Sequence, residues 1–248
     1  MTTTAYVGKG TVYLQDRTNS GKPLYPIGNC SKVTDSIEIE NKELPDYENA
    51  GGGTAAKFSR VKSVKTTIDM TSFSPENLAM ALRGSVSAQS SVTAIVGEAA
   101  TVPALGSLIP LARLMDTSVA PVVKKSGTTV TAATNYEVRR GGIFVLANAA
   151  TLLAGDAITV DYTPLASDLI QTLVNSSVDY RVVIDGLNEA NSGKAVRITK
   201  HRVQFDPAQS LDWIGDDFGK LSVSGTQLAD TTITTDGLSQ YQTIQAVR

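Results

Sequence analysis

Two adjacent aspartates, Asp216 and Asp217, are the first residues whose types could support chemistry. With Asp206 they could form an acid/base pair or a metal site in an enzyme of an unfamiliar type. Adjacent residues of a strand point to opposite faces, however, and Phe218 and Gly219 follow as a turn signal. We therefore expect a solvated turn here.

The one histidine and the one cysteine add little chemistry. His201 has only basic neighbours, which are Arg197, Lys200 and Arg202. A hydrolase triad needs a carboxylate to orient the imidazole, and this pattern supplies none. One histidine and Cys30 cannot form the usual structural zinc sets, and a lone cysteine allows no intrachain disulfide. We expect no catalytic residue, no metal and no cofactor, hence no enzyme.

Charge and hydropathy argue against two further classes. The chain has 22 Lys+Arg against 24 Asp+Glu, a net charge of −2, which gives no general attraction to nucleic acid. No apolar run reaches the ~18 residues of a membrane span, and the first five residues lack the basic segment of a signal peptide. We expect a protein without a membrane partner that stays in the cytoplasm where it is made.

Strand patterns dominate the chain. Residues 36–40 and 63–70 alternate apolar and polar side chains, as half-buried antiparallel strands do. Similar short runs occur at residues 11–14, 180–184, 195–199, 221–223 and 241–247. Short strands separated by turn residues favour a sandwich or a barrel. The sequence therefore predicts a mainly β, antiparallel β-sandwich.

One flanking α-helix is expected after Ser74. Ser74 is a good N-cap, Pro75 suits the first helical position, and Gly84 suits the end of the helix. Leu78 and Leu82 are four residues apart and form one apolar stripe. A helix this short is marginal alone, so we expect the stripe to pack on the sheet.

Residues 85–165 differ from their flanks, because they hold only ten charged residues. Their own strand patterns lie at residues 136–139, 143–146 and 157–162. We interpret this segment as an inserted small β domain, Ig-like or similar, within a parent domain formed by residues 1–84 and 166–248. One continuous sheet is the alternative. A weaker helical pattern covers residues 164–173.

The stretch from residue 35 to residue 65, which includes the strand pattern at 36–40 and the start of the one at 63–70, has two limbs of opposite charge. The first limb carries Asp35, Glu38, Glu40, Glu43, Asp46 and Glu48 against the single base Lys42, and the second carries Lys57, Arg60, Lys62 and Lys65. The limbs could bind a second copy head to tail, or they could pair with each other across a hairpin. The candidate contact residues are Glu43, Asp46, Tyr47, Glu48, Gly51, Gly52, Gly53, Lys57, Arg60 and Lys62.

A series of short motifs runs along both flanks of the insertion. These are Ile27-Gly28-Asn29, Lys42-Glu43-Leu44-Pro45-Asp46-Tyr47, Gly51-Gly52-Gly53-Thr54, Ser72-Phe73-Ser74-Pro75-Glu76-Asn77-Leu78-Ala79, Asp185-Gly186-Leu187-Asn188, Asp216-Asp217-Phe218-Gly219 and Gly225-Thr226-Gln227-Leu228-Ala229-Asp230. Each is weak alone, but in this order and spacing the chain resembles the tail tube, or major tail, proteins of long-tailed (siphovirus-type) bacteriophages.

The resemblance implies a β-sandwich that assembles into hexameric rings, in which one sheet of each subunit joins a barrel around a lumen. Stacked rings would form the tail tube of the virion, built in the bacterial host cytoplasm. Its partners would be further copies, the tape-measure protein, the tail terminator and the distal tail protein. Residues 85–165 would form an outward-facing domain that some relatives carry.

The resemblance also implies that double-stranded DNA passes through the tube without tight binding. A lumen that lets a polyanion slide should expose few cations. The basic cluster of residues 197–202 would oppose this expectation if its strand faced the lumen.

A different class stays open, a soluble adhesive or carbohydrate-binding β module. Such a module needs an exposed aromatic cluster. The content of 6% aromatic residues with a single tryptophan, Trp213, argues against it.

Overall fold

The computed structural model describes residues 5–18, 21–91 and 93–247. These residues form a mainly β structure with antiparallel sheets and a single α-helix, which confirms the predicted fold class at this level. No helix in the described ranges is long and apolar enough to cross a membrane. The expectation that no signal peptide is present rests partly on residues 1–4, which lie outside the described residues.

The chain divides into two compact units. Unit 1 comprises Met1–Val86 with Ile170–Arg248, and unit 2 comprises Ser87–Leu169. These divisions lie two and four residues after the predicted boundaries at 84/85 and 165/166. The weak helical pattern at residues 164–173 is wrong, because this stretch contains strand β13 (Ser167–Gln171), which pairs with β5 (Ser85–Gln89).

Unit 1 is built on one antiparallel sheet. Its strands are β1 (Gly8–Asp16), β2 (Tyr25–Pro26), β3 (Cys30–Pro45), β4 (Thr54–Met70), β14 (Asp179–Asn188), β15 (Lys194–Phe205), β16 (Leu221–Gln227) and β17 (Gln242–Ala246). The order is β2-β1-β14-β15-β16-β4-β3, and β17 also pairs with β15. Strand β15 uses residues 196–200 to pair with β17 and residues 203–205 to pair with β16. The strands predicted at residues 11–14, 36–40, 63–70, 180–184, 195–199 and 221–223 lie within observed strands, and the one predicted at residues 241–247 contains β17 and exceeds it by one residue at each end.

The core of unit 1 lies between this sheet and the helix. It contains Val12, Leu14, Ile27, Ile68, Met70, Leu78, Met80, Ala81, Val182, Val203, Phe205, Leu221 and Val223. Because these side chains come from strands distant in the sequence, no single segment could form this core alone. A short 3-10 helix, η1 (Glu189–Asn191), connects β14 to β15.

Helix α1 (Pro75–Ala81) begins as predicted but ends earlier. The Ser74 side chain accepts a hydrogen bond from the Asn77 N–H at 3.2 Å. At the other end Arg83 takes the left-handed conformation with φ 47°, and the Gly84 N–H donates to the Ala79 carbonyl at 2.7 Å. This is a Schellman end with arginine where glycine is usual.

Two details of the helix prediction are therefore corrected. Leu82 is the C-cap and is only partly buried, while Leu78, Met80 and Ala81 face the core. Gly84 does not supply the left-handed residue. A Cβ there would lie 2.4 Å from the Gln171 carbonyl oxygen, so close contact with β13 requires the glycine.

Unit 2 has its own core between two sheets. Its strands are β6 (Ile95–Thr101), β7 (Leu108–Pro110), β8 (Val122–Lys125), β9 (Thr128–Thr129), β10 (Tyr136–Arg139), β11 (Gly142–Val145) and β12 (Ala157–Tyr162). They form the sheets β10-β11-β7 and β6-β12-β8-β9. Ile109 and Ile143 from the first sheet share a cluster with Val123 and Ile158 from the second. Both sheets thus contribute to a core that is separate from that of unit 1.

Truncation of the helix stripe should distinguish its two leucines. Leu78→Ala should destabilise unit 1 by roughly 2–5 kcal/mol, since Leu78 is 8% exposed and its removal leaves a cavity. Leu82→Ala should cost clearly less, because its side chain is already partly in solvent. Calorimetric unfolding of both variants measures the difference. Equal losses for the two would contradict the assignment of the packed face.

Candidate interaction surface

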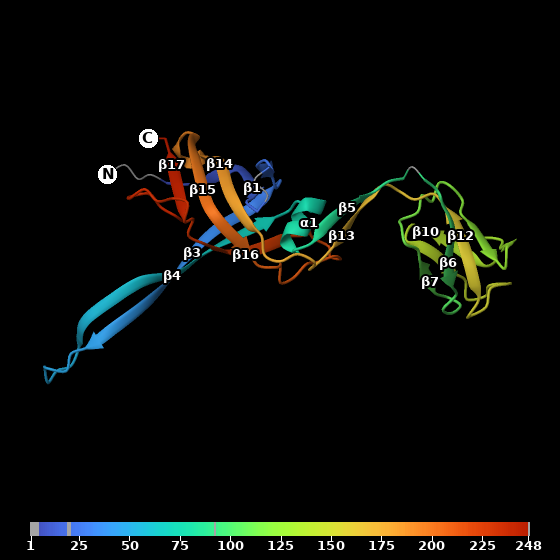
Figure 1. Ribbon diagram of the computed structural model, residues 1–248, viewed down its shortest axis with the longest axis horizontal. Coiled ribbons are helices and arrows are strands. Elements are labelled where there is room, and N and C mark those ends of the chain that lie inside the picture. The colour runs from blue at the N-terminus through green and yellow to red at the C-terminus, as the bar shows by residue number, and fades with distance from the viewer. Residues whose placement is uncertain (1–4, 19–20, 92, 248) are drawn as a thin grey trace. The chain divides into compact units, whose positions relative to one another are not determined.

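The hairpin of β3 and β4 projects beyond the packed part of unit 1 (Figure 1). Its strands pair from Cys30 opposite Met70 to Pro45 opposite Thr54. Met70, opposite Cys30 within the packed sheet, is fully buried, whereas every residue from 54 to 62 of β4 is exposed. The distal hairpin is therefore a two-stranded ribbon, an arrangement that is at best marginally stable alone in water.

Acids of β3 pair with bases of β4 across this ribbon. The salt bridges are Glu38 Oε1 to Lys62 Nζ at 2.7 Å, Glu40 Oε2 to Arg60 Nη2 at 2.7 Å and Glu43 Oε1 to Lys57 Nζ at 3.5 Å. The hydrogen bond from Lys62 lowers the pKa of Glu38 and raises that of Lys62. The limbs thus pair with each other, and their opposite charges are not by themselves a means of binding another chain. Exposed pairs of this kind contribute little to stability.

The tip of the hairpin is an ordered turn. Asp46 Oδ1 accepts hydrogen bonds from the Glu48 and Asn49 N–H groups at 2.9 and 3.2 Å, and the Asp46 N–H donates to the Gly53 carbonyl at 2.8 Å. The Asn49 side chain and the Glu48 N–H hold the pKa of Asp46 below its usual value. Gly52 and Gly53 have φ of 64° and 135°, which explains why the turn needs glycine there. This turn presents Tyr47, whose exposure is 83%.

Exposed apolar side chains line the ribbon, and the charge pattern did not reveal them. They are Ile37, Ile39, Leu44, Phe58 and Val61, each more than half exposed. Ile39 opposes Val61 on one face, and Phe58 and Leu44 lie on the other, opposite Lys42 and Ala56. The period-two alternation of residues 36–40 predicted a half-buried strand. The strand is present, but the predicted burial is wrong, because Ile37 and Ile39 are exposed.

An ion pair between a buried lysine and a partly exposed aspartate lies at the root of the hairpin. Lys200 on β15 is 1% exposed, and its Nζ lies 2.6 Å from Asp35 Oδ1 and 2.5 Å from Oδ2 on β3. Gln242 of β17 accepts a further hydrogen bond from Nζ at 3.1 Å. Thr66 donates to Asp35 at 2.8 Å, and Gln227 donates to Thr66 at 2.9 Å. This network joins five strands at the point where the ribbon begins.

The remaining bases of the 197–202 cluster also have partners within unit 1. Arg202 Nε lies 2.7 Å from Asp179 Oδ2, and the Arg197 guanidinium donates to Gln245. Since Lys200 points into the protein instead of out of it, these residues do not form one continuous basic surface.

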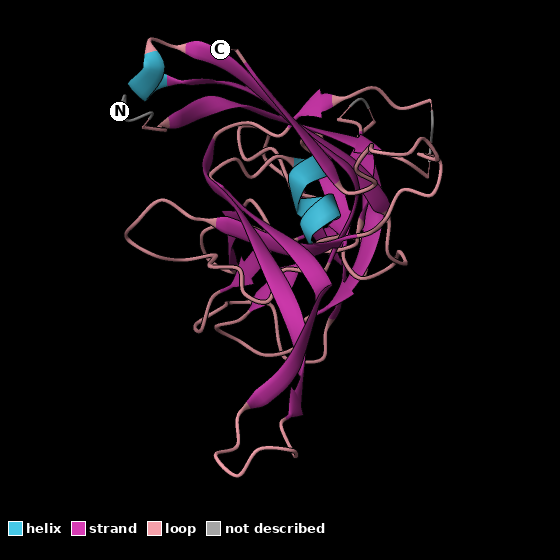
Figure 2. Cartoon of the chain, turned by 90° about the vertical axis from the view of Figure 1, so that its left-hand side faces the viewer, coloured by secondary structure: helices cyan, strands magenta, loops and turns pink. Residues whose placement is uncertain are grey.

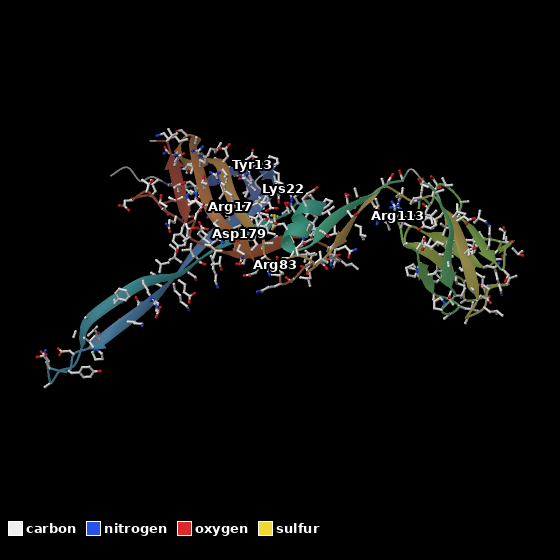
Figure 3. All side chains as sticks on the ribbon, in the orientation of Figure 1. Tyr13, Arg17, Lys22, Arg83, Arg113 and Asp179 are labelled. Atoms are coloured by element: carbon white, nitrogen blue, oxygen red, sulfur yellow. The ribbon has the colours of Figure 1, made fainter. Side chains whose placement is uncertain are left out.

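His201 is held beside a second ion pair. Arg17 Nη1 donates to the His201 carbonyl and to Asp230 Oδ2, both at 2.7 Å, and its backbone N–H donates to the carbonyl of Asp179 (Figure 3). Burial lowers the pKa of His201, so the ring is neutral at pH 7. The hydrogen bond from Arg17 lowers the pKa of Asp230 to about 2. These contacts are structural, because they fix the end of β1 to β15.

The acidic residues considered for catalysis do not converge. Asp216 and Asp217 lie exposed in the loop before β16, and Asp206 is 3.6 Å from Arg83. Within residues 5–18, 21–91 and 93–247, no group of three or more His, Cys, Asp or Glu could hold a metal ion. Burial raises the pKa of the Cys30 thiol to about 11, so it is protonated at neutral pH.

A cleft of about 460 Å³ lies beside α1. It is lined by Tyr25, Tyr180 and Arg83, among others, and Arg83 is seen next to the helix in Figure 3. Arg83 Nη2 is used in a hydrogen bond to the Phe205 carbonyl at 3.0 Å. Burial raises the pKa of Tyr25 to about 12. Tyr25 is therefore a neutral phenol at pH 7 and Arg83 has a structural role, while Asp16, Glu76 and Lys22 supply the other charged groups of the lining.

The loop before β16 carries an apolar cluster that the sequence prediction missed. Trp213, Ile214 and Phe218 are 71%, 97% and 95% exposed. The sequence gave the number of such residues, but not that these three side chains are exposed on one loop. This loop is a second surface that could contact another molecule.

The fold and these surfaces define a mainly β protein with a projecting hairpin and an inserted second unit. The chain belongs to the family described as Protein of unknown function UCP028589, whose model matches residues 5–245. No curated protein matches the chain.

The ion pair of Lys200 with Asp35 gives a direct test. Asp35→Ala should destabilise unit 1 by up to about 5 kcal/mol, because the Lys200 ammonium would lose its counter-ion inside the protein. The double variant Asp35→Ala/Lys200→Met should recover most of this loss, since an apolar side chain replaces the buried charge. Denaturant unfolding measures both. A single variant as stable as the wild type would show that Lys200 is not buried as described.

Proposed function

We propose that this protein is a structural component of a phage tail, a tail tube protein of long-tailed bacteriophages. It polymerises as stacked hexameric rings into a conduit for the genome. In this proposal it is located in the virion after assembly in the bacterial host cytoplasm, and it is not an enzyme. Its partners are other copies of itself, the tape-measure protein, the tail terminator and the distal tail protein.

The observation that carries the proposal is the projecting ribbon of β3 and β4. It exposes Ile39 and Val61 on one face and Leu44 and Phe58 on the other, so neither face is buried within the chain. A two-stranded element of this kind needs a further surface for stability. The resemblance in sequence places the same segment, residues 42–54, among its motifs. Contact with a neighbouring ring would bury the ribbon.

The edge of the sheet supports assembly through strands. β3 is the last strand of its sheet, and the described residues place no strand beyond its 16 residues. A long free edge exposes unpaired backbone groups, which natural proteins cover or pair. In the proposed ring, unit 1 is an antiparallel β-sandwich whose edge strands join those of neighbouring subunits. Closure into one barrel would remove these edges, and unit 2 would face outward.

The exposed face of β4 and β16 suits a lumen for DNA. Its side chains are mostly hydroxyls, and Thr67 Oγ1 donates to Ser224 Oγ at 3.3 Å. Ser222 Oγ donates to Asp69 Oδ1 at 2.6 Å. With Lys65 and Asp69 on the same face, positive and negative charge are nearly balanced. Short neutral side chains would let a polyanion slide, because few counterions are released on contact.

Removal of the ribbon should prevent stacking without unfolding the protein. We expect a variant with residues 41–59 replaced by Asn-Gly, a favoured hairpin turn, to keep the thermal unfolding of the wild type. Concentrated wild-type protein should form rings or tubes in negative-stain electron microscopy, and the shortened variant should not. Tubes from the shortened variant in wild-type yield would refute a role for the ribbon.

A charge-swapped hairpin is the matched control. Glu40→Arg/Arg60→Glu keeps the length of the ribbon and its cross-strand pair. If that pair acts within the hairpin, the swapped protein should assemble as the wild type does. Wild-type protein that stays a monodisperse monomer at every concentration would contradict the proposed function itself.

Assembled tubes should bind duplex DNA weakly and with little dependence on salt. We expect no submicromolar binding at low salt, because Lys200 is buried and Arg202 is paired with Asp179. The variant Ser224→Lys/Thr226→Lys adds cations to the hydroxyl-rich face and should bind more tightly, with a steeper salt dependence. Fluorescence anisotropy with labelled duplex measures both. Tight, strongly salt-dependent binding by the wild type would exclude a passive conduit.

A second candidate function is a soluble adhesive or carbohydrate-binding module. Trp213 and Phe218 favour it, since exposed aromatic side chains in a loop can stack on a sugar ring. The two proposals differ in the state of the purified protein. A monomer that binds a glycan surface and loses this binding in Trp213→Ala would support the adhesive module. Tubes that form normally with Trp213→Ala and bind no glycan would exclude it.

A further inference from the structure

An open apolar surface lies at the end of unit 1 that carries β17. Val12, Ile184, Ile198 and Ile244 are register neighbours across β1, β14, β15 and β17. The next row along the sheet consists of Gly10, Gly186, Val196 and Ala246. Two adjoining hollows of about 620 and 390 Å³ lie along these rows and share Tyr6, Val196 and Ile198 as lining residues. We call this surface the trough.

Paired glycines deepen the trough. Gly10 and Gly186 oppose each other, and a Cβ on Gly10 would lie 2.5 Å from the Asp185 carbonyl oxygen. A Cβ on Gly186 would lie 2.4 Å from the Lys9 carbonyl oxygen. Any larger residue would force the strands apart, so backbone forms this part of the floor.

The walls of the trough are exposed to solvent. Ile244 is 63% exposed, Tyr6 61% and Val247 59%. A surface of this kind is unusual on a protein that acts alone.

The rim of the trough is basic. Lys9 and Lys32 line one hollow and Lys194 lines the other, and the described lining residues include no acid. In the part of the chain that the structure describes, none of these three lysines forms a salt bridge. The trough therefore fits a partner that is both apolar and acidic.

The tip of the hairpin has this chemistry. Between Lys42 and Lys57 the chain contains three acids, Glu43, Asp46 and Glu48, and no base. Glu43 is paired with Lys57, which leaves Asp46 and Glu48 without a cation. Between these two acids Tyr47 is 83% exposed, and Leu44 nearby is 55% exposed. The tip therefore has an exposed aromatic side chain between two acids, and the trough has an apolar floor with lysines at its rim. The two surfaces are complementary in hydrophobicity and in charge.

The tip and the trough lie at opposite ends of unit 1. The hairpin descends to the bottom of Figure 1, whereas β17 and both chain ends lie at the top. Figure 2, turned by 90°, shows the same separation. The tip of a chain therefore does not reach its own trough in this structure. Contact between different surfaces of two copies is heterologous. It builds an open filament unless the rotation between successive copies closes them into a ring.

We propose that the trough is the receptor for the hairpin tip of a second copy of this chain. Tyr47 and Leu44 enter between Tyr6 and Ile244, and Asp46 and Glu48 face Lys9 and Lys194. This inference rests on the proposed function, for which it names the receiving surface of the stack. Each subunit then carries one tip and one trough, and the charge pattern sets the direction in which copies join.

Charge reversal on each side tests the proposal. The tip variant is Asp46→Asn/Glu48→Lys, in which asparagine can still accept the hydrogen bonds of the turn. The trough variant is Lys9→Glu/Lys194→Glu. Each alone should raise the concentration needed for tubes by roughly tenfold or more, because like charges then face each other. An equal mixture of the two variants should assemble again, since each tip then meets a trough of opposite charge. Arg140→Glu, an exposed reversal in unit 2, is the control and should assemble normally.

A cross-link gives an independent measurement. In a Cys30→Ser background, Tyr47→Cys/Ile244→Cys should form a ladder of disulfide-linked oligomers on oxidation, and either cysteine alone should form no ladder. Normal assembly of the trough variant, or tubes from the double-cysteine protein that yield no ladder, would overturn the trough and leave the tail tube proposal intact. Wild-type protein that forms no tubes would overturn both.

Discussion

The contact of Lys200 with Asp35 decides where the packed body of unit 1 ends and the free hairpin begins. An ammonium group that is 1% exposed requires an anion and further acceptors, and β3 and β17 supply them through Asp35 and Gln242. The contact also fixes β3 against β15, two strands that are not neighbours in the sheet. β3 is the edge strand, and β4 pairs with β16 only as far as Val64, which lies opposite Ile37 of β3. Beyond this point β3 and β4 have only each other as partners, so the distal part is a ribbon.

This division has a physical consequence for the ribbon. Its ion pairs are solvent-exposed and contribute little, and its apolar side chains are divided between two open faces. The ribbon therefore keeps its pairing but gains little burial within one chain. The trough at the other end of unit 1 has the converse property, an apolar floor with cations and no described acid. One molecule thus carries a ribbon with unburied apolar side chains and an open apolar trough. These two surfaces are a reason to consider assembly before catalysis.

The second unit does not enter this argument, because it has its own core. Asn135, which is 2% exposed, accepts hydrogen bonds from the N–H and the hydroxyl of Thr151 at 2.7 and 2.9 Å. These bonds connect the loop between β11 and β12 to the turn before β10. Tyr162 donates to Glu98 at 2.7 Å across β12 and β6. Such internal polar contacts are those expected of a unit that folds by itself.

The sequence alone determined what depends on local pattern. The alternation of residues 63–70 specified the inner half of β4, and Ser74 and Pro75 specified the start of α1. Low charge density marked a segment whose limits lie two and four residues before the divisions between the two units. The tertiary structure decided what depends on distant contacts. Arg83 holds the left-handed position, Gly84 is required for close approach to Gln171, and the Lys200 side chain is buried against Asp35 of β3. The trough exists only because Gly10 and Gly186, 176 residues apart, oppose each other. Local propensity acts over a few residues, whereas burial and charge pairing depend on which strands meet.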